Sequence, residues 1–243
     1  MMLKLKTMLL AIYMDQSAKK VFAPALKQYA SVLLEKIMPV FDDLDGEQQR
    51  AGDEFLDSLS PHTDYDSAMD AAYDHSIDHV LLFQEMRSTF LAAGVAGLFH
   101  LFERQIYRHL KRETRDYQLT DTKDQPFIID EISKVEELLR CFTKGHNVLG
   151  QTIKEAWEDP DLVEARLVAN AVKHGTGKSY DKLRQIKARV IDPVRVEADF
   201  TVGDFTSNSP LVIEPEDVIR YRDAMLRFWQ VRGSFEWDTS TSA

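Results

Sequence analysis

Apolar side chains recur at steps of three and four residues along most of the chain, a spacing typical of amphipathic helices. The pattern predicts helices over residues 17–41, 46–58, 65–115, 128–143, 160–174, 180–190 and from 214 onward. The longest of these carries the apolar stripe Leu91, Val95, Leu98, Phe102 and Ile106. Gly94 and Gly97 lie in the middle of this stripe and indicate a bend or a close approach of another segment.

Capping residues mark several helix ends. Asp159 before Pro160 predicts an N-cap followed by proline at the first helical position, and Gly175 predicts the end of the same helix. Thr63 or Asp64 is available to cap the long helix, and Ser179 is expected to cap the helix over 180–190.

Alternating apolar residues occur convincingly only in Val196 to Ile213, which predicts a small C-terminal β-hairpin at about 196–213. The expected fold class is therefore mainly α, a helical bundle with one hairpin. We expect an N-terminal helical extension over 1–62, a helical domain over 63–232 and a loose polar tail over 233–243. Met8 to Met14 is expected to be a helix that packs on the domain or a partner. No apolar run approaches the roughly 18 residues that span a membrane, so no membrane association is expected.

The charge is unevenly distributed. The net charge of −10 argues against a general nucleic-acid coat, but residues 166–195 hold eight Lys and Arg against two Asp. The acidic surplus lies elsewhere, notably in Asp42 to Asp78. The single cysteine, Cys141, excludes an internal disulfide and fits a reducing compartment, so a cytoplasmic location is expected.

The helix over 160–174 carries the main candidate for chemistry. Arg166, Asn170 and His174 are spaced by four residues and therefore share one face. Arginine binds phosphate oxygens in pairs, and a neutral histidine can take a proton from a ribose 2′-hydroxyl. Asparagine can orient either neighbour. The alternative is that Asn170 and His174 only cap the helix, where its dipole favours a positive charge.

The stretch from Asn170 to Ser179, with Arg166 upstream, resembles the signature helix of the HEPN superfamily. A second stretch, Gly97 to Tyr107, is similar to the earlier core helix of such proteins. The resemblance implies a small all-α protein of prokaryotic defence, toxin–antitoxin or RNA-processing systems. Many members carry an Arg-polar-x-x-x-His pattern that forms a metal-independent ribonuclease site across a homodimer.

On this resemblance we expect a metal-independent endoribonuclease that acts without a cofactor or metal. The expected catalytic residues are Arg166, Asn170 and His174, the expected phosphate contacts are Lys173, Lys178, Lys182 and Arg104, and Glu103 has a supporting role. The expected partners are RNA, a second copy of the chain and a protein of the same operon. The rival expectation is a catalytically degenerate dimerisation or interaction subunit. It is favoured by Ala169, which occupies the position of the pattern's arginine; Arg166 lies one turn earlier.

Three other signals are given weaker interpretations. Gly175 to Ser179 imitates the end of a phosphate-binding loop, but Val172 stands where that motif needs glycine. Asp74, His75, Asp78 and His79 have spacings able to hold a metal, although a polar helix face is the favoured interpretation. His109 falls on the apolar stripe and is expected to be a core histidine.

Overall fold

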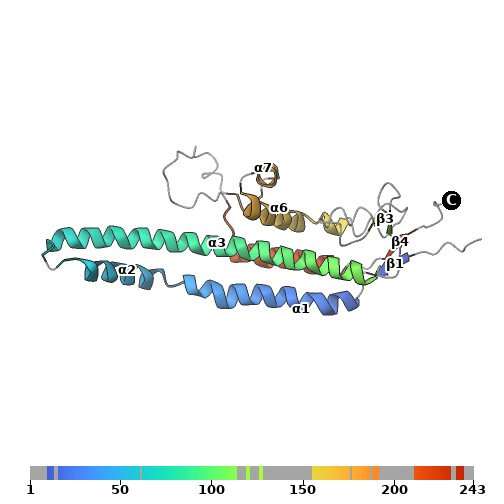
Figure 1. Ribbon diagram of the computed structural model, residues 1–243, viewed down its shortest axis with the longest axis horizontal. Helices are drawn as coiled ribbons and strands as arrows, with labels where there is room; N and C mark the ends of the chain where they lie inside the picture. Colours follow the sequence, from blue (N-terminus) through green and yellow to red (C-terminus); the bar gives the residue numbers. More distant parts are fainter. Residues whose placement is uncertain are drawn as a thin grey trace, which may run out of the picture. The chain divides into compact units, whose positions relative to one another are not determined.

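The computed structural model describes residues 10–13, 16–60, 62–113, 119–120, 126–127, 155–175, 177–186, 188–191, 211–230 and 234–237. Helices dominate this part of the chain (Figure 1), which confirms the mainly α fold class. The predicted helix over 128–143 lies outside the described residues. So does almost all of the predicted hairpin at about 196–213; of its end, Leu211 forms an isolated antiparallel bridge with Ile191.

The helices are α1 (Gln16–Val32), α2 (Leu44–Ser58), α3 (Tyr65–Glu113), α6 (Pro160–His174), α7 (Lys178–Gln185) and α9 (Pro215–Phe228). A π-helical turn (Leu33–Ile37) and a 3₁₀ turn (Met38–Phe41) continue α1. Asp64 accepts a hydrogen bond from the Ser67 amide at 3.1 Å and so caps α3. The expected cap at Ser179 is wrong, because α7 begins one residue earlier and has extended Gly177 as its N-cap.

Two short antiparallel pairs of strands accompany the helices. β1 (Leu10–Tyr13) pairs with β4 (Ser234–Trp237), with Leu10 opposite Trp237. β2 (Leu119–Thr120) pairs with β3 (Pro126–Phe127). The helix expected for Met8 to Met14 is therefore a strand over its middle. A short apolar run suits either conformation, and here a partner strand more than 200 residues away decides between them.

The contacts of the chain divide it into two compact units. Unit 1 comprises Met1–Tyr29, Gly97–Arg166 and Ile219–Ala243, and unit 2 comprises Ala30–Ala96 and Leu167–Val218. Helices α1, α3, α6 and α9 contribute residues to both units. The division expected at residue 62 concerns which parts fold independently, and it stays a prediction.

Unit 1 has an aromatic core. The Phe102 ring lies 5.2 Å from that of Phe228 and 6.1 Å from that of Trp229, and both contacts are edge-to-face. Phe22 of α1 lies 4.9 Å from Trp229. His109 is buried and meets the Trp229 ring edge-on at 5.7 Å, which confirms it as a core histidine. Rings from two distant segments, Phe22 of α1 and the Phe228–Trp229 pair, thus help to bury the second half of α3.

Unit 2 contains a helical hairpin in which α2 runs antiparallel to the first half of α3 (Figure 1). His79 Nε2 lies 3.4 Å from Glu47 Oε2, and Phe55 stacks on His75 with ring centres 4.8 Å apart. Further along, Phe41 contacts Phe83 and Phe90. A methyl group added to Gly94 would meet the end of the Leu33 side chain, so a side chain packs closely against this glycine.

The π-helical turn changes which residues of the first helix are buried. A regular helix would place Ile37 on the same face as Leu33, as the apolar spacing predicts. The π-turn takes more residues per turn, so Met38 and Phe41 are buried instead and Ile37 is exposed. The α3 stripe has no such interruption, and all five of its residues are completely buried.

Candidate nucleic-acid interface and its supporting contacts

Helix α6 begins and ends where the capping residues predict. Asp159 Oδ1 accepts a hydrogen bond from the Asp161 amide at 3.0 Å. The helix stops at Gly175, whose φ of +70° is a left-handed conformation that glycine adopts at low cost. Leu162, Ala165, Val168 and Ala169 are buried and orient the helix. These contacts determine which α6 side chains reach solvent.

Arg166 is partly buried and already engaged. Its guanidinium carbon lies 5.2 Å from the ring centre of Trp157 in unit 1. Such a contact typically contributes about 0.5–1 kcal/mol at a partly exposed site. The side chain expected to bind phosphate therefore has a structural role as well.

Asn170 is partly buried, and His174 is exposed in the last turn of α6. Within the described part of the chain, neither side chain forms a hydrogen bond or an ion pair. The capping alternative therefore lacks its expected side-chain bonds there, and Gly175 ends the helix without them. Eight residues separate Arg166 from His174, about 12 Å along the axis, whereas the HEPN pattern's five residues would span about 7.5 Å.

Exposed basic side chains surround the end of α6 and continue onto α7. We call Lys173, His174, Lys178 and Lys182 the α6–α7 basic surface; all four are exposed and belong to unit 2. Lys178 and Lys182 are one turn apart on α7, whose opposite face buries Tyr180 and Leu183. The structure thus leaves the three lysines expected to bind phosphate accessible to solvent.

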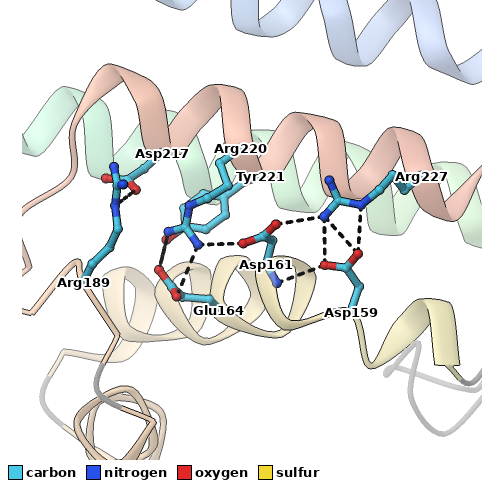
Figure 2. Close-up of polar contacts among 8 residues, drawn as sticks. All are labelled: Asp159, Asp161, Glu164, Arg189, Asp217, Arg220, Tyr221 and Arg227. Atoms are coloured by element: carbon cyan, nitrogen blue, oxygen red, sulfur yellow. Dashed lines mark hydrogen bonds and ion pairs between the residues drawn. The ribbon is translucent and has the colours of Figure 1, made fainter.

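Arg189 belongs to the same basic stretch but is paired. Its Nε lies 2.8 Å from Oδ1 of Asp217, which is almost completely buried (Figure 2). Asp217 Oδ2 also accepts a hydrogen bond from the Glu214 amide at 3.0 Å, in the manner of a capping box at the start of α9. Arg189 therefore compensates a buried carboxylate and adds little free positive charge.

The two residues expected from the earlier helix lie in unit 1. Arg104 is exposed, and Glu103 is partly buried with its Oε2 2.9 Å from His100 Nδ1. The contact with His100 gives Glu103 a partner on its own helix. That Arg104 and Glu103 act together with the basic surface stays a prediction.

An ion-pair cluster that the sequence analysis missed joins α6 to α9 within unit 1 (Figure 2). This α6–α9 cluster consists of Asp159, Asp161, Glu164, Arg220 and Arg227. Arg220 donates to Glu164 Oε1 at 2.6 Å and to Asp161 Oδ1 at 2.8 Å. Arg227 donates to Asp159 and Asp161 at 2.8–3.0 Å. Acidic residues at the start of α6 are favoured by the helix dipole alone, so their presence does not indicate ion pairs. The arginines that bind them lie about 60 residues away in the sequence.

Glu164 is the buried centre of the α6–α9 cluster. Its Oε1 also accepts a hydrogen bond from the Tyr221 hydroxyl at 2.7 Å. Arg220 lies over the Tyr221 ring, with its guanidinium carbon 4.7 Å from the ring centre. A buried carboxylate with charged and neutral donors is well compensated, so the cluster stabilises the packing of α6 on α9.

The carboxylate of Asp161 has a shifted pKa. Burial raises the pKa of Asp161, but the hydrogen bonds from Arg220 and Arg227 outweigh burial and lower it below its usual value. Burial likewise lowers the pKa of Arg227, while its bonds to Asp161 and Asp159 raise it overall. The charged form of each partner is therefore favoured in the folded state.

The side chains considered for a metal have other contacts. His75 stacks on Phe55, and His79 lies beside Glu47. Among the described residues, no three His, Cys, Asp or Glu side chains are grouped as metal ligands. Over the same part of the chain, no helix has the length and apolar character needed to cross a membrane.

Comparisons with known proteins give no further indication of what this site binds. The chain matches no protein-family model, no curated protein and no solved structure.

Proposed function

We propose that this protein is a HEPN-like, RNA-directed protein that binds RNA through the α6–α7 basic surface. The observation that supports the proposal is the exposure of Lys173, His174, Lys178 and Lys182 on a chain whose net charge is −10. A local positive surface on an acidic protein favours one phosphate-binding site over general adhesion to nucleic acid. The HEPN assignment itself rests on the resemblance of the α6 and α3 stretches.

Metal-independent endoribonuclease activity is the second candidate function, and His174 is the residue that favours it. An exposed imidazole next to Lys173 can accept the proton of a 2′-hydroxyl while lysines hold the phosphate. The 2′-oxygen then bonds to phosphorus, the bond between phosphorus and the 5′-oxygen breaks, and the 5′-oxygen takes up a proton from water, which leaves a 2′,3′-cyclic phosphate.

Two observations favour RNA binding without cleavage. Ala169, at the position of the pattern's arginine, is only 1% exposed and offers no group to a substrate. Arg166 lies against Trp157 and is a turn further from His174 than the HEPN pattern requires. Binding is therefore the primary proposal, in agreement with the alternative of a catalytically degenerate subunit.

The resemblance also supports a homodimer and a role in prokaryotic defence or a toxin–antitoxin system, with a partner from the same operon. A dimer would bring two copies of α6 to one composite site. We expect light scattering at micromolar concentration to give twice the mass of the chain. A monomer at that concentration would remove the composite-site proposal and leave the basic surface as a single-chain binding site.

The RNA-binding proposal is tested by removing lysines from the basic surface. In Lys178→Ala/Lys182→Ala we expect weaker binding to a single-stranded RNA. The dependence of log affinity on log salt should decrease by about 1.4, because each lost phosphate contact removes about 0.7. Lys20→Ala/Lys27→Ala is the matched control, since both lysines are exposed on α1. Equal loss in the two double variants would show non-specific attraction and contradict the proposed surface.

Cleavage is tested with His174→Ala in EDTA. If the protein is a metal-independent nuclease, the wild type cuts RNA in chelator and the variant is slower by about 10²–10⁴-fold, with RNA affinity little changed. Arg166→Ala is expected to reduce thermal stability as well, because its contact with Trp157 is lost. Activity that is lost in EDTA and restored by magnesium or manganese would contradict the metal-independent mechanism.

A further inference from the structure

We call α2 together with residues 65–90 of α3 the α2–α3 arm. The residues that are fully buried in this arm are small. Its buried side chains are Ala51, Ala68, Ala72 and Ser76. A methyl group added to Gly52 would lie 3.7 Å from Ser76 Cβ. The two helices therefore approach closely but bury little apolar area, since each alanine removes only one methyl group from water.

Several large apolar side chains of the same arm face solvent. Tyr65, Met69 and Tyr73 are exposed at steps of four residues, and so are Leu82, Met86 and Phe90. Tyr73 is 62% exposed while its neighbour Ala72 is buried. Small side chains are thus the most buried ones in this helical pair, while several large ones are exposed. Exposed apolar rows of this kind are characteristic of surfaces that bind another helix.

One of these rows borders a hollow between α2 and α3. The hollow has a volume of about 330 Å³ and is lined by both apolar and acidic residues. Leu56, Met69 and Tyr73 supply apolar surface, and Asp45 and Asp53 supply negative charge on the α2 side. An occupant must therefore offer apolar side chains to the hollow and positive charge beside it.

The charge of the arm determines which occupant fits. The arm contains ten Asp and Glu against two basic residues, Arg50 and Arg87, which is a net charge of −8. A second copy would place this charge against an identical one, and RNA or an anionic membrane would also be repelled. A helix with lysine or arginine along one side gains from the same charge.

We propose that the hollow between α2 and α3 is a docking site for an amphipathic, basic helix of a partner protein. The apolar face of that helix contacts Met69, Tyr73 and Leu56, and its basic side chains lie near Asp45 and Asp53. This site is independent of the proposed RNA function, because its acidic charge excludes a polyanion. It gives the predicted operon partner a defined chemistry.

The probe for this site is an 18-residue synthetic helix with leucines on one face and lysines on the other. We expect a dissociation constant in the micromolar range, about −8 kcal/mol, that weakens with added salt. Two control peptides separate the contributions. One has the same composition in a scrambled order that breaks the apolar face, and the other has glutamate for every lysine. Both should bind at least about tenfold more weakly.

Matched variants locate the probe. Met69→Ser/Tyr73→Ser should weaken binding by about tenfold or more, whereas Leu82→Ser/Met86→Ser, on the other exposed row, should stay within about twofold. Asp45→Asn/Asp53→Asn should weaken binding more than Asp57→Asn/Asp66→Asn, which changes the net charge equally but lies outside the hollow. Circular dichroism checks that each variant is folded, which is expected because Met69 and Tyr73 are exposed.

Two results would overturn the proposal. If the basic peptide does not bind, or binds equally to the hollow variants and their controls, the hollow is not the docking site. If the wild type dimerises in sedimentation and Met69→Ser/Tyr73→Ser is a monomer, the occupant is a second copy. The RNA measurements on Lys178→Ala/Lys182→Ala are unaffected by either result, so the two proposals fail separately.

Discussion

The two halves of helix α3 place large apolar side chains in opposite environments. Along residues 97–110, Leu98, Phe102 and Ile106 are completely buried, and rings from two other segments, Trp157 and the Phe228–Trp229 pair, surround Phe102. Along residues 65–90, Tyr73 and Phe90 are exposed, and small side chains contact α2. The helix itself is continuous, so backbone conformation does not account for the difference.

The neighbours of each half explain the contrast. In unit 1, the aromatic core gives the second half of α3 a dense environment. Among the described residues of the α2–α3 arm, those that are fully buried are small. Segments with few buried contacts open at lower free energy than the core, so the arm should exchange its amide hydrogens faster. We therefore expect the second half of α3 to contribute most to stability, whereas the first half carries the proposed docking site.

The largest expected effect comes from truncating the aromatic core. Phe102→Ala should lower the free energy of unfolding by about 3–5 kcal/mol, because it leaves a cavity among Trp157, Phe228 and Trp229. Phe90→Ala, the same change in the other half of α3, should cost less than about 1 kcal/mol because Phe90 is 46% exposed. Urea unfolding of the two variants measures both values, and equal losses would remove the contrast between the halves.

A smaller effect is expected from the α6–α9 cluster. Glu164→Gln keeps the shape of the side chain but leaves Arg220 without its buried negative partner, which should cost about 1–3 kcal/mol. Glu54→Gln is the matched control in the arm, where Glu54 pairs with Arg50 at the surface. Its cost should stay within about 0.5 kcal/mol. A loss in Glu164→Gln no larger than in the control would show that the cluster is dispensable.

The smallest expected effect concerns acid stability. The folded state lowers the pKa of Asp161, so the unfolded state binds its proton more tightly. Stability from Asp161 is therefore present above its unfolded pKa of about 3.9 and is lost as pH falls through the lower, folded value. Partly exposed pairs contribute on the order of 0.2–1 kcal/mol. Urea midpoints from pH 6 to pH 3 should fall less steeply in Asp161→Asn, and identical slopes would contradict this linkage.

The basic residues of the candidate site show how far sequence reasoning reaches. The excess of Lys and Arg over 166–195 treats every positive charge alike. In the structure, Arg166 lies against Trp157 and Arg189 binds buried Asp217, whereas Lys178 and Lys182 remain exposed. The stretch is basic as predicted, but the partners of Arg166 and Arg189 come from other elements. Such partners leave no periodic signal near the arginines themselves.

Local physics was sufficient for much of this protein. The steps of three and four residues predicted the buried stripe from Leu91 to Ile106, and the caps Asp64, Asp159 and Gly175 predicted helix ends. These features depend on residues within one or two turns of each other, so the sequence by itself determines them. Helical spacing alone does not account for the exposure of Ile37, because a π-turn changes the helical phase there.

Only the tertiary structure decided which polar and apolar groups find partners. The pairing of Arg220 with Glu164, the strand formed by Leu10–Tyr13 and the burial of alanine beside exposed Tyr73 all depend on segments distant in sequence. Burial and ion pairing are properties of the space around a side chain, and that space is created by chain segments meeting. The helical pattern in the sequence therefore determines that α2 and α3 form. Their packing on small residues, which leaves several large apolar side chains exposed, is decided only by the tertiary structure.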